Sequence, residues 1–144
     1  MTYLISACLL GAPCRYDGES RPMSEAIQKL FEGNVLIPIC PEVMGGLPTP
    51  RTPAERVGER VLCRDGRDVS DAYRRGAEEV LRLVRLYHAE GVILRDRSPS
   101  CGTDGIYDGT FSGRLTAGMG VTAELLAKAG VPILNERGER VGGE

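Results

Sequence analysis

Short apolar runs of strand-forming residues alternate with helical segments along this chain, and that alternation restricts its possible folds more than any other feature. Four runs are predicted strands, at residues 2–8, 34–40, 91–95 and 131–134. Three segments between them carry helical patterns, at residues 23–32, 70–90 and 119–129. The strand runs are continuously apolar, which is typical of a parallel sheet covered on both faces. We therefore expect an α/β fold, a three-layer Rossmann-like sandwich with a central, mostly parallel sheet.

The remaining segments are rich in glycine and proline and are predicted to be loops that carry small hairpin insertions. Residues 41–58 and 96–118 are the two long loops, residues 9–22 form a shorter one, and residues 137–144 form a polar tail. Asp65-Gly66 is a turn signal between residues 60–63 and 67–69, and Asp108-Gly109 is a second one. A chain of 144 residues has the length of one domain, so residues 1–144 are predicted to form a single domain.

Charge and cysteine content exclude several classes of function. The net charge of −2 lacks the basic excess of a dedicated nucleic-acid binder, so no stable nucleic-acid partner is expected. No apolar run approaches the roughly 20 residues that a membrane span requires. The first residues lack the basic region of a signal peptide. The 5 cysteines are an odd number, so they cannot all pair in disulfides. These observations predict a cytoplasmic protein without a disulfide framework, and they leave the oligomeric state open.

Three cysteines fall at the ends of three successive predicted strands. Cys8 closes the first strand, Cys40 closes the second, and Cys101 lies in the loop after the third. The carboxyl ends of parallel strands share one edge of a sheet, and ligands bind at that edge. We therefore expect these thiols to converge in one crevice, with Cys14 close by as a fourth thiol. Cys63 lies apart from the strand ends, so its predicted role is packing.

Several kinds of site fit converging cysteines. An iron–sulfur cluster accepts thiolates from dispersed loops, and three thiolates on four irons would leave one iron open. A structural or regulatory zinc site could use Cys8, Cys14, Cys40 and Cys101, although the paired spacing typical of such sites is absent. One cysteine could instead be the nucleophile of a sulfur-handling enzyme. Buried thiols that only pack are the remaining alternative.

At these cysteines the sequence resembles a known bacterial family, the thiouracil desulfidases, long labelled only as a domain of unknown function. The resemblance covers nearly the whole chain in order. Its matching segments are residues 6–11, 14–18, 40–42, 45–51, 53–55, 65–66, 68–69, 98–102, 106–111 and 118–123. One departure is Arg95, where lysine is expected before the segment Ser98-Pro99-Ser100-Cys101.

The resemblance implies a [4Fe–4S] cluster held by only three cysteines, which would be Cys8, Cys40 and Cys101 here. It implies non-redox desulfuration of a thionated pyrimidine. The thione sulfur binds the open iron, and water replaces it to give uracil and hydrosulfide. The small-molecule substrate would be a thionucleobase or thionucleotide. By the same resemblance, Glu42 and Ser98 would be the catalytic residues.

The positions of the polar residues agree with those roles and also allow other ones. Glu42 lies two residues after Cys40, where it could act as a general base on water. Ser98 could orient that water, or it could only cap a turn before Pro99. Polar residues of the crevice loops are predicted to bind the pyrimidine or a phosphate: Arg15, Tyr16, Asp17, Arg51 and Ser100. A salt-bridge network that holds the loops is the alternative for the charged residues among them.

Overall fold

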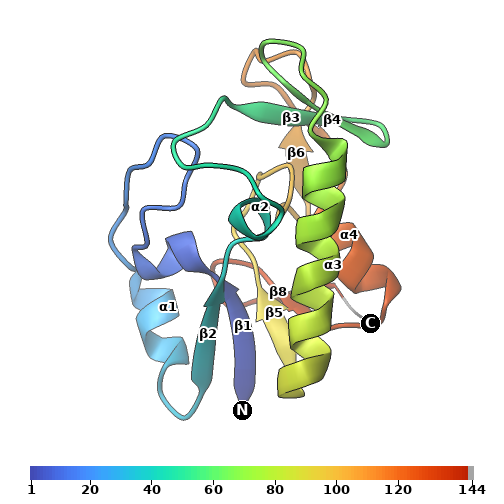
Figure 1. Ribbon diagram of the computed structural model, residues 1–144. Coiled ribbons are helices and arrows are strands. Elements are labelled where there is room, and N and C mark those ends of the chain that lie inside the picture. The colour runs from blue at the N-terminus through green and yellow to red at the C-terminus, as the bar shows by residue number, and fades with distance from the viewer. Residues whose placement is uncertain (143–144) are drawn as a thin grey trace.

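A central five-stranded sheet organises the protein, and the computed structural model describes residues 1–142 of it. The strands lie in the order β2-β1-β5-β8-β9 (Figure 1). Their bounds are β1 Thr2–Ser6, β2 Val35–Ile39, β5 Gly91–Ile93, β8 Ile133–Leu134 and β9 Arg140–Gly142. The first four strands pair in parallel, and β9 pairs with β8 in the antiparallel direction. The predicted polar tail therefore contains an edge strand. Its last two positions lie outside the described residues.

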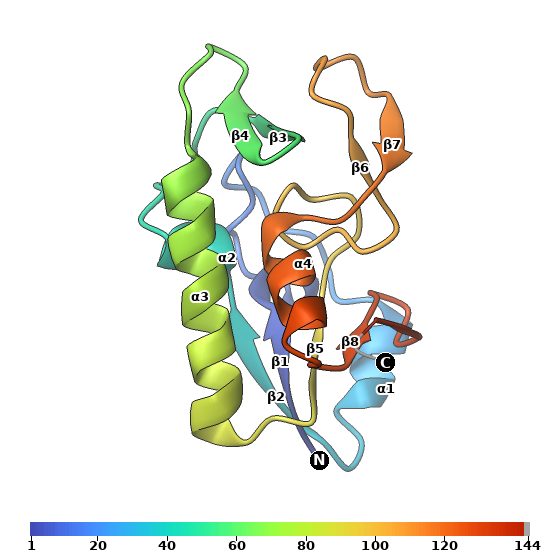
Figure 2. The ribbon, with the colours of Figure 1, turned by 90° about the vertical axis from the view of Figure 1, so that its right-hand side faces the viewer.

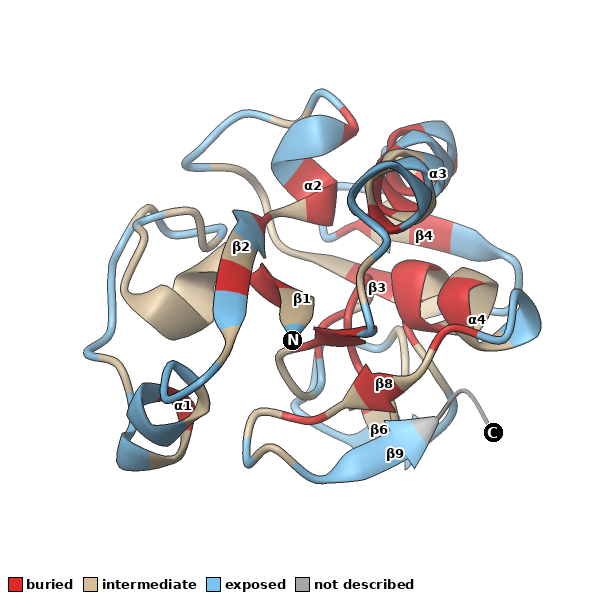
Figure 3. Ribbon diagram, turned by 90° about the horizontal axis from the view of Figure 1, so that it is seen from below, coloured by how far each residue is buried: buried red, intermediate tan, exposed pale blue. Residues whose placement is uncertain are grey.

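Helices cover both faces of the sheet and give the predicted three layers. Helix α1, Glu25–Leu30, lies on one face, while α3, Ser70–Tyr87, and α4, Val121–Lys128, lie together on the other (Figure 2, Figure 3). Side chains alternate between the two cores along each strand, as the strand pleat requires. Leu4 of β1 packs with α3 and α4, whereas the next residue, Ile5, packs with α1. The predicted α/β sandwich is confirmed.

The long helix α3 forms because one of its stripes is apolar at helical spacing. Its buried stripe includes Tyr73, Ala77, Val80 and Val84. The helix ends at His88, which adopts the left-handed conformation with φ 52°. Its last helical residue, Tyr87, therefore lies three residues before residue 90, the predicted end of this helical segment. Among the described residues, no helix is both long enough and apolar enough to span a membrane.

Two small hairpins stand above the carboxyl edge of the sheet, and both extend beyond the predicted ones. The first pairs β3, Ala54–Val57, with β4, Arg60–Cys63, across a turn before residue 60 that was not predicted. The predicted turn at Asp65-Gly66 is also present, because residues 67–69 run antiparallel to β4 through a short bridge between Leu62 and Asp68. Residues 54–57 lie in a proline-rich context, which hid this strand from the sequence pattern. The second hairpin pairs β6, Gly105–Tyr107, with β7, Leu115–Ala117, across a loop much longer than Asp108-Gly109.

Short helical turns follow β1 and β2 at the carboxyl edge. A 3-10 helix, η1, spans Ala7–Leu10, and a one-turn helix, α2, spans Pro41–Met44 within the segment predicted to be all loop. Pro41 occupies the first turn of α2, where its missing N–H is tolerated. The chain passes from β1 to β2 through α1 on one face. It then reaches β5 through α3 on the other face, so the winding direction reverses beside β1. Ligand sites of open α/β sheets lie at such a reversal.

The backbones of α2 and α3 touch at two glycines. A Cβ at Gly45 would lie 1.9 Å from the carbonyl oxygen of Ala72, and one at Gly76 would lie 1.9 Å from that of Pro41. Only residues without a side chain permit this approach. The contact presses α2 against α3, and so fixes the residues that begin α2.

Candidate active site

The strand-end cysteines meet in one pocket at the carboxyl edge of the sheet. Cys8 lies in η1, Cys40 precedes α2, and Cys101 lies in the loop after β5. All three line a partly open pocket with about 300 Å³ of space, and Cys14 lines it too. The convergence predicted from the strand order is therefore present. Cys63 is buried in β4 and lies outside this pocket, in keeping with its predicted packing role.

Hydrogen bonds among the thiols favour ionisation of two of them. The Cys14 thiol hydrogen-bonds to the sulfurs of Cys8 and Cys40. These bonds are the main cause that lowers the pKa of Cys8 to about 7 and that of Cys40 to about 6, against the opposing effect of burial. The same two bonds raise the pKa of Cys14, which therefore keeps its proton. At neutral pH the pocket supplies thiolates, the form of cysteine that binds metal.

Cys101 is the most deeply buried ligand candidate. Burial raises the pKa of its thiol to about 12. The Ser6 hydroxyl donates a hydrogen bond to Cys101 Sγ at 3.5 Å and counteracts part of that effect. Ser6 also accepts the backbone N–H of Arg95 at 3.1 Å, so one hydroxyl links the ends of β1 and β5.

Glu42 is a buried carboxylate at the pocket wall. Its Oε2 accepts a hydrogen bond from Arg51 Nε at 2.9 Å and forms an ion pair with Arg51 Nη2 at 2.8 Å. Its Oε1 accepts a longer bond from the Ser98 hydroxyl at 3.4 Å. One oxygen is thus saturated by a guanidinium, while the other keeps capacity for a further donor. Tyr73 of α3 lies close enough that, after burial, the charge of Glu42 helps to raise the pKa of that phenol.

Ser98 has its acceptor capacity filled by the backbone. Its Oγ accepts N–H bonds from Ser100 at 3.0 Å and from Cys101 at 3.2 Å. A hydroxyl has two lone pairs and one proton, so Ser98 retains only its donor function in the pocket. The turn-capping role and the contact with Glu42 therefore coexist.

Arg51 is committed to the protein itself. Besides Glu42, its guanidinium donates to the carbonyl oxygen of Cys14 at 2.9 Å and to the Thr49 hydroxyl at 3.0 Å. Its donors therefore hold the loops together and fix the carboxylate. This arrangement matches the alternative of a salt-bridge network more closely than substrate binding by Arg51.

The cysteine pocket opens into a wider cleft of about 1980 Å³, which includes the solvent at its mouth. Arg15 and Tyr16 line the cleft, and Arg15 also reaches the cysteine pocket. Asp17 lines neither space; it is exposed and lies 3.8 Å from Arg15 Nε. Arg15 and Tyr16 are thus placed where a substrate would lie, while Asp17 stands behind Arg15.

Ser100 does not reach the site. Its side chain is fully buried, its hydroxyl lies 2.7 Å from that of Thr122 at the start of α4, and it lines neither space. The backbone is also close-packed here, because a Cβ at Gly120 would lie 2.3 Å from the carbonyl carbon of Ser100. This placement does not support the predicted contact between Ser100 and a substrate.

Sequence reasoning missed three polar residues of this region. Ser6 ends β1 and Arg95 follows β5 by two residues, at the same edge as the cysteines, which was the available signal for both. Tyr73 belongs to the buried stripe of α3, yet it also lines the cleft. The apolar pattern of a helix does not show that the first turn of the helix extends past the edge of the sheet, as it does in α3.

The thiols of the pocket are the donor type that an iron–sulfur cluster takes. Within residues 1–142, no three side chains of His, Cys, Asp or Glu form a group that could hold a metal ion directly. A four-iron cluster binds each cysteine at a different corner, so its ligands stand farther apart than those of one tetrahedral ion. The donors also suit it, because thiolates are the ligands that such clusters take.

Comparisons with known proteins agree with this picture. A family model described as 2-thiouracil desulfurase matches residues 3–138. A Bacillus subtilis (strain 168) protein described as "Uncharacterized protein YbbK" is 42% identical over 143 residues, covering 92% of this chain and 94% of the relative. A solved structure described as the [4Fe-4S]-dependent thiouracil desulfidase TudS superposes with a TM-score of 0.88 at 45% identity. That match covers 94% of this chain and 90% of the other. The chain belongs to the 2-thiouracil desulfurase family.

Proposed function

We propose that this protein is a thiouracil desulfidase that replaces the sulfur of a thionated pyrimidine with oxygen from water. The observation that carries the proposal is the pocket itself, where three strand-end thiols face the Glu42–Ser98 pair. The similar structure of TudS, described as a [4Fe–4S]-dependent thiouracil desulfidase, supports the same activity. The family match over residues 3–138 supports a single desulfidase-like domain over residues 1–144.

Cys8, Cys40 and Cys101 would hold the cluster. When bound, a cluster with three cysteine ligands supplies one iron with an open position, a Lewis acid that polarises the soft thiocarbonyl. Cys14 would act on the ligands by hydrogen bonding. In the cluster-free pocket its thiol keeps a proton and hydrogen-bonds to two of the three ligands, so it would prepare Cys8 and Cys40 as thiolates.

Glu42 would accept the proton of the attacking water. Its Oε1 faces the pocket beside Ser98, and its Oε2 is fixed by Arg51. A base held at one oxygen can present the other in a constant orientation, which is the geometric requirement for general-base catalysis. Arg51 is therefore a positioning residue.

Ser98 would turn the hydrogen bond of its only proton from Glu42 Oε1 to the water oxygen that attacks the thione carbon. Both of its lone pairs are occupied by backbone N–H groups, so it cannot compete with Glu42 as a base. A fixed donor next to the reacting carbon stabilises negative charge that develops on oxygen during the attack.

The reaction balances without a redox partner. The C=S double bond of the thione is replaced by a C=O double bond: water adds to the carbon as the C=S π bond opens onto sulfur, and the remaining C–S bond then breaks with both of its electrons on sulfur as C=O forms. One proton of the water ends on Glu42 and the other on sulfur, so the products are uracil and hydrosulfide. Arg15 and Tyr16 line the cleft that would take the rest of the substrate. A cytoplasmic location is also part of the proposal, because thiols stay reduced there.

A turnover assay on cluster-reconstituted protein tests the proposal. We expect 2-thiouracil to be consumed under anaerobic conditions, with uracil and sulfide released in equal amounts. Protein reconstituted with zinc should be inactive. Uracil formation by metal-free protein that is abolished by alkylation would instead assign the activity to a cysteine nucleophile and contradict the proposal.

A further inference from the structure

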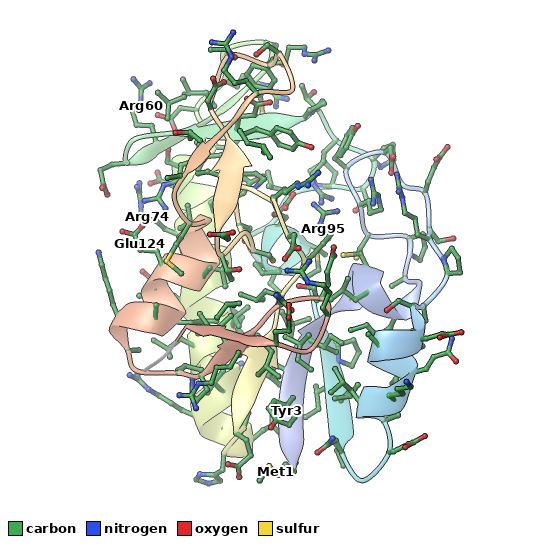
Figure 4. The ribbon with its side chains drawn as sticks, turned by 180° about the vertical axis from the view of Figure 1, so that it is seen from behind. Met1, Tyr3, Arg60, Arg74, Arg95 and Glu124 are labelled. Carbon is green, nitrogen blue, oxygen red and sulfur yellow. The ribbon has the colours of Figure 1, made fainter. Side chains whose placement is uncertain are left out.

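Two arginines at the junction of the pocket and the cleft donate no hydrogen bond from their guanidinium groups within residues 1–142. Arg95 and Arg15 line both spaces. Figure 4 shows Arg95 at the end of β1 that lies opposite Met1, which is the end where η1 begins. Arg51 lines the same pocket but is fully engaged by Glu42 and loop oxygens. Arg51 therefore has a structural role, whereas the guanidinium groups of Arg15 and Arg95 remain available in the pocket.

Arg95 is a partly buried cation among sulfur atoms. Within residues 1–142 its guanidinium makes no hydrogen bond and no ion pair, and only its backbone N–H is used, by Ser6. Burial alone would lower the pKa of Arg95, but the charges of Cys8, Cys101 and Glu42 outweigh burial and raise that pKa. Arg95 also lines the cysteine pocket, which places its charge beside the thiols.

Arg15 presents an unsatisfied donor to the same region. Its Nε is buried and has no hydrogen-bond partner among the described residues. The nearest carboxylate oxygen, on Asp17, lies 3.8 Å away, beyond hydrogen-bond distance. A buried N–H without an acceptor is unfavourable, so this donor indicates an acceptor that the chain does not provide. Both arginines lie near enough to Cys8 to lower the pKa of its thiol.

We propose that Arg95 and Arg15 form an anion site at the mouth of the cysteine pocket, and that this site binds the hydrosulfide released from the substrate. The inference rests on the proposed desulfidase activity. The reacting thionated base and water are neutral, whereas sulfur leaves as an anion into a pocket already lined by thiolates. Two cations whose guanidinium groups donate no hydrogen bond to a carboxylate of the described residues offset that added charge, and their N–H groups supply the donors that an anion accepts.

A sulfide titration of the reconstituted holoenzyme tests this site without any substrate. Sodium sulfide is added anaerobically, and the change in the visible and electron paramagnetic resonance spectra gives the sulfide Kd. We expect Arg95→Gln to raise that Kd roughly tenfold or more, the loss typical of a charge-assisted hydrogen bond. Arg15→Gln should also weaken binding, and Arg95→Lys should weaken it less than Arg95→Gln because the charge remains.

Arg97→Gln is the matched control, because Arg97 is exposed, lines the cleft and does not line the cysteine pocket. It should leave the sulfide Kd unchanged. Wild-type Kd values in both Arg95→Gln and Arg15→Gln would overturn the inference. If Arg95→Gln does not hold the cluster, wild-type values in Arg95→Lys and Arg15→Gln together overturn it. If the wild-type holoenzyme binds sulfide but does not convert thiouracil, the proposed activity is contradicted, whereas the anion site is still supported.

Discussion

The Ser98 hydroxyl donates to Glu42 Oε1 at 3.4 Å while its oxygen accepts two backbone N–H groups. This relationship assigns the two residues different chemistry. Ser98 has a proton to give and no lone pair free, whereas Glu42 has an acceptor oxygen that faces the pocket. The pair joins α2 to the loop after β5, so the second and third parallel strands, in chain order, each contribute one half of it.

Glu42→Gln should retain the cluster and lose turnover. An amide has nearly the shape of the carboxylate but cannot accept the proton of water, and general-base catalysis contributes roughly 10² to 10⁴ in rate. Steady-state kcat with 2-thiouracil, measured at equal iron content, checks this. Full activity of Glu42→Gln would remove the carboxylate from the mechanism.

The two serines of one loop should respond in opposite ways. Ser98→Ala removes the donor at the pocket, so kcat should fall by roughly 10² to 10³, the loss typical of one donor to a developing oxyanion. Ser100→Ala should leave kcat unchanged and lower the free energy of unfolding by about 1–3 kcal/mol, because the buried Thr122 hydroxyl loses its partner. Urea unfolding and turnover of both variants separate the two effects, and equal kcat losses would refute the distinction.

Cys14 should control the ionisation of its neighbours. In cluster-free protein, ultraviolet thiolate absorbance should show two early titrations, with midpoints near the pKa of about 6 for Cys40 and about 7 for Cys8. Both pKa values are lowered, so the thiolates are present above these pH values and are lost as the pH falls through them. Cys14→Ala should move both midpoints up toward the ordinary value of 9.0, because the bonds that stabilise the thiolates are gone. Cys14→Ser retains a donor and should move them less; identical curves for all three proteins would contradict the role of Cys14.

Gly45→Ala should destabilise the fold and weaken cluster binding together. The new methyl group would lie 1.9 Å from the carbonyl oxygen of Ala72, so α2 must move away from α3 and take Cys40 and Glu42 with it. Overpacking of this kind costs roughly 1–3 kcal/mol. Gly33→Ala is the control, since nothing lies within 4 Å of its Cβ position; only its left-handed backbone, with φ +80°, opposes the change. Urea unfolding and iron content of the two variants measure the difference.

The sequence pattern predicted the sheet, its helices and the meeting point of the cysteines. The reason is that the carboxyl ends of parallel strands share one edge of a sheet. The pattern could not predict where the side chains point within that edge. Arg51 and Ser100 are polar and lie in the crevice loops, yet one is held by Glu42 and the other is buried against Thr122. Ser6 was not predicted as a site residue, and Arg95 was noted only as a departure from the family pattern, because a single polar residue at the end of an apolar run carries no periodic signal.

Iron content of cysteine variants after anaerobic reconstitution tests the central claim most directly. About four irons per chain are expected in the wild-type protein and in Cys63→Ala and Cys14→Ala. Alanine at Cys8, Cys40 or Cys101 should abolish stable cluster binding and thiouracil turnover. One zinc and no iron in wild-type protein, with retention dependent on all four pocket cysteines, would contradict the account and assign the pocket to a structural ion.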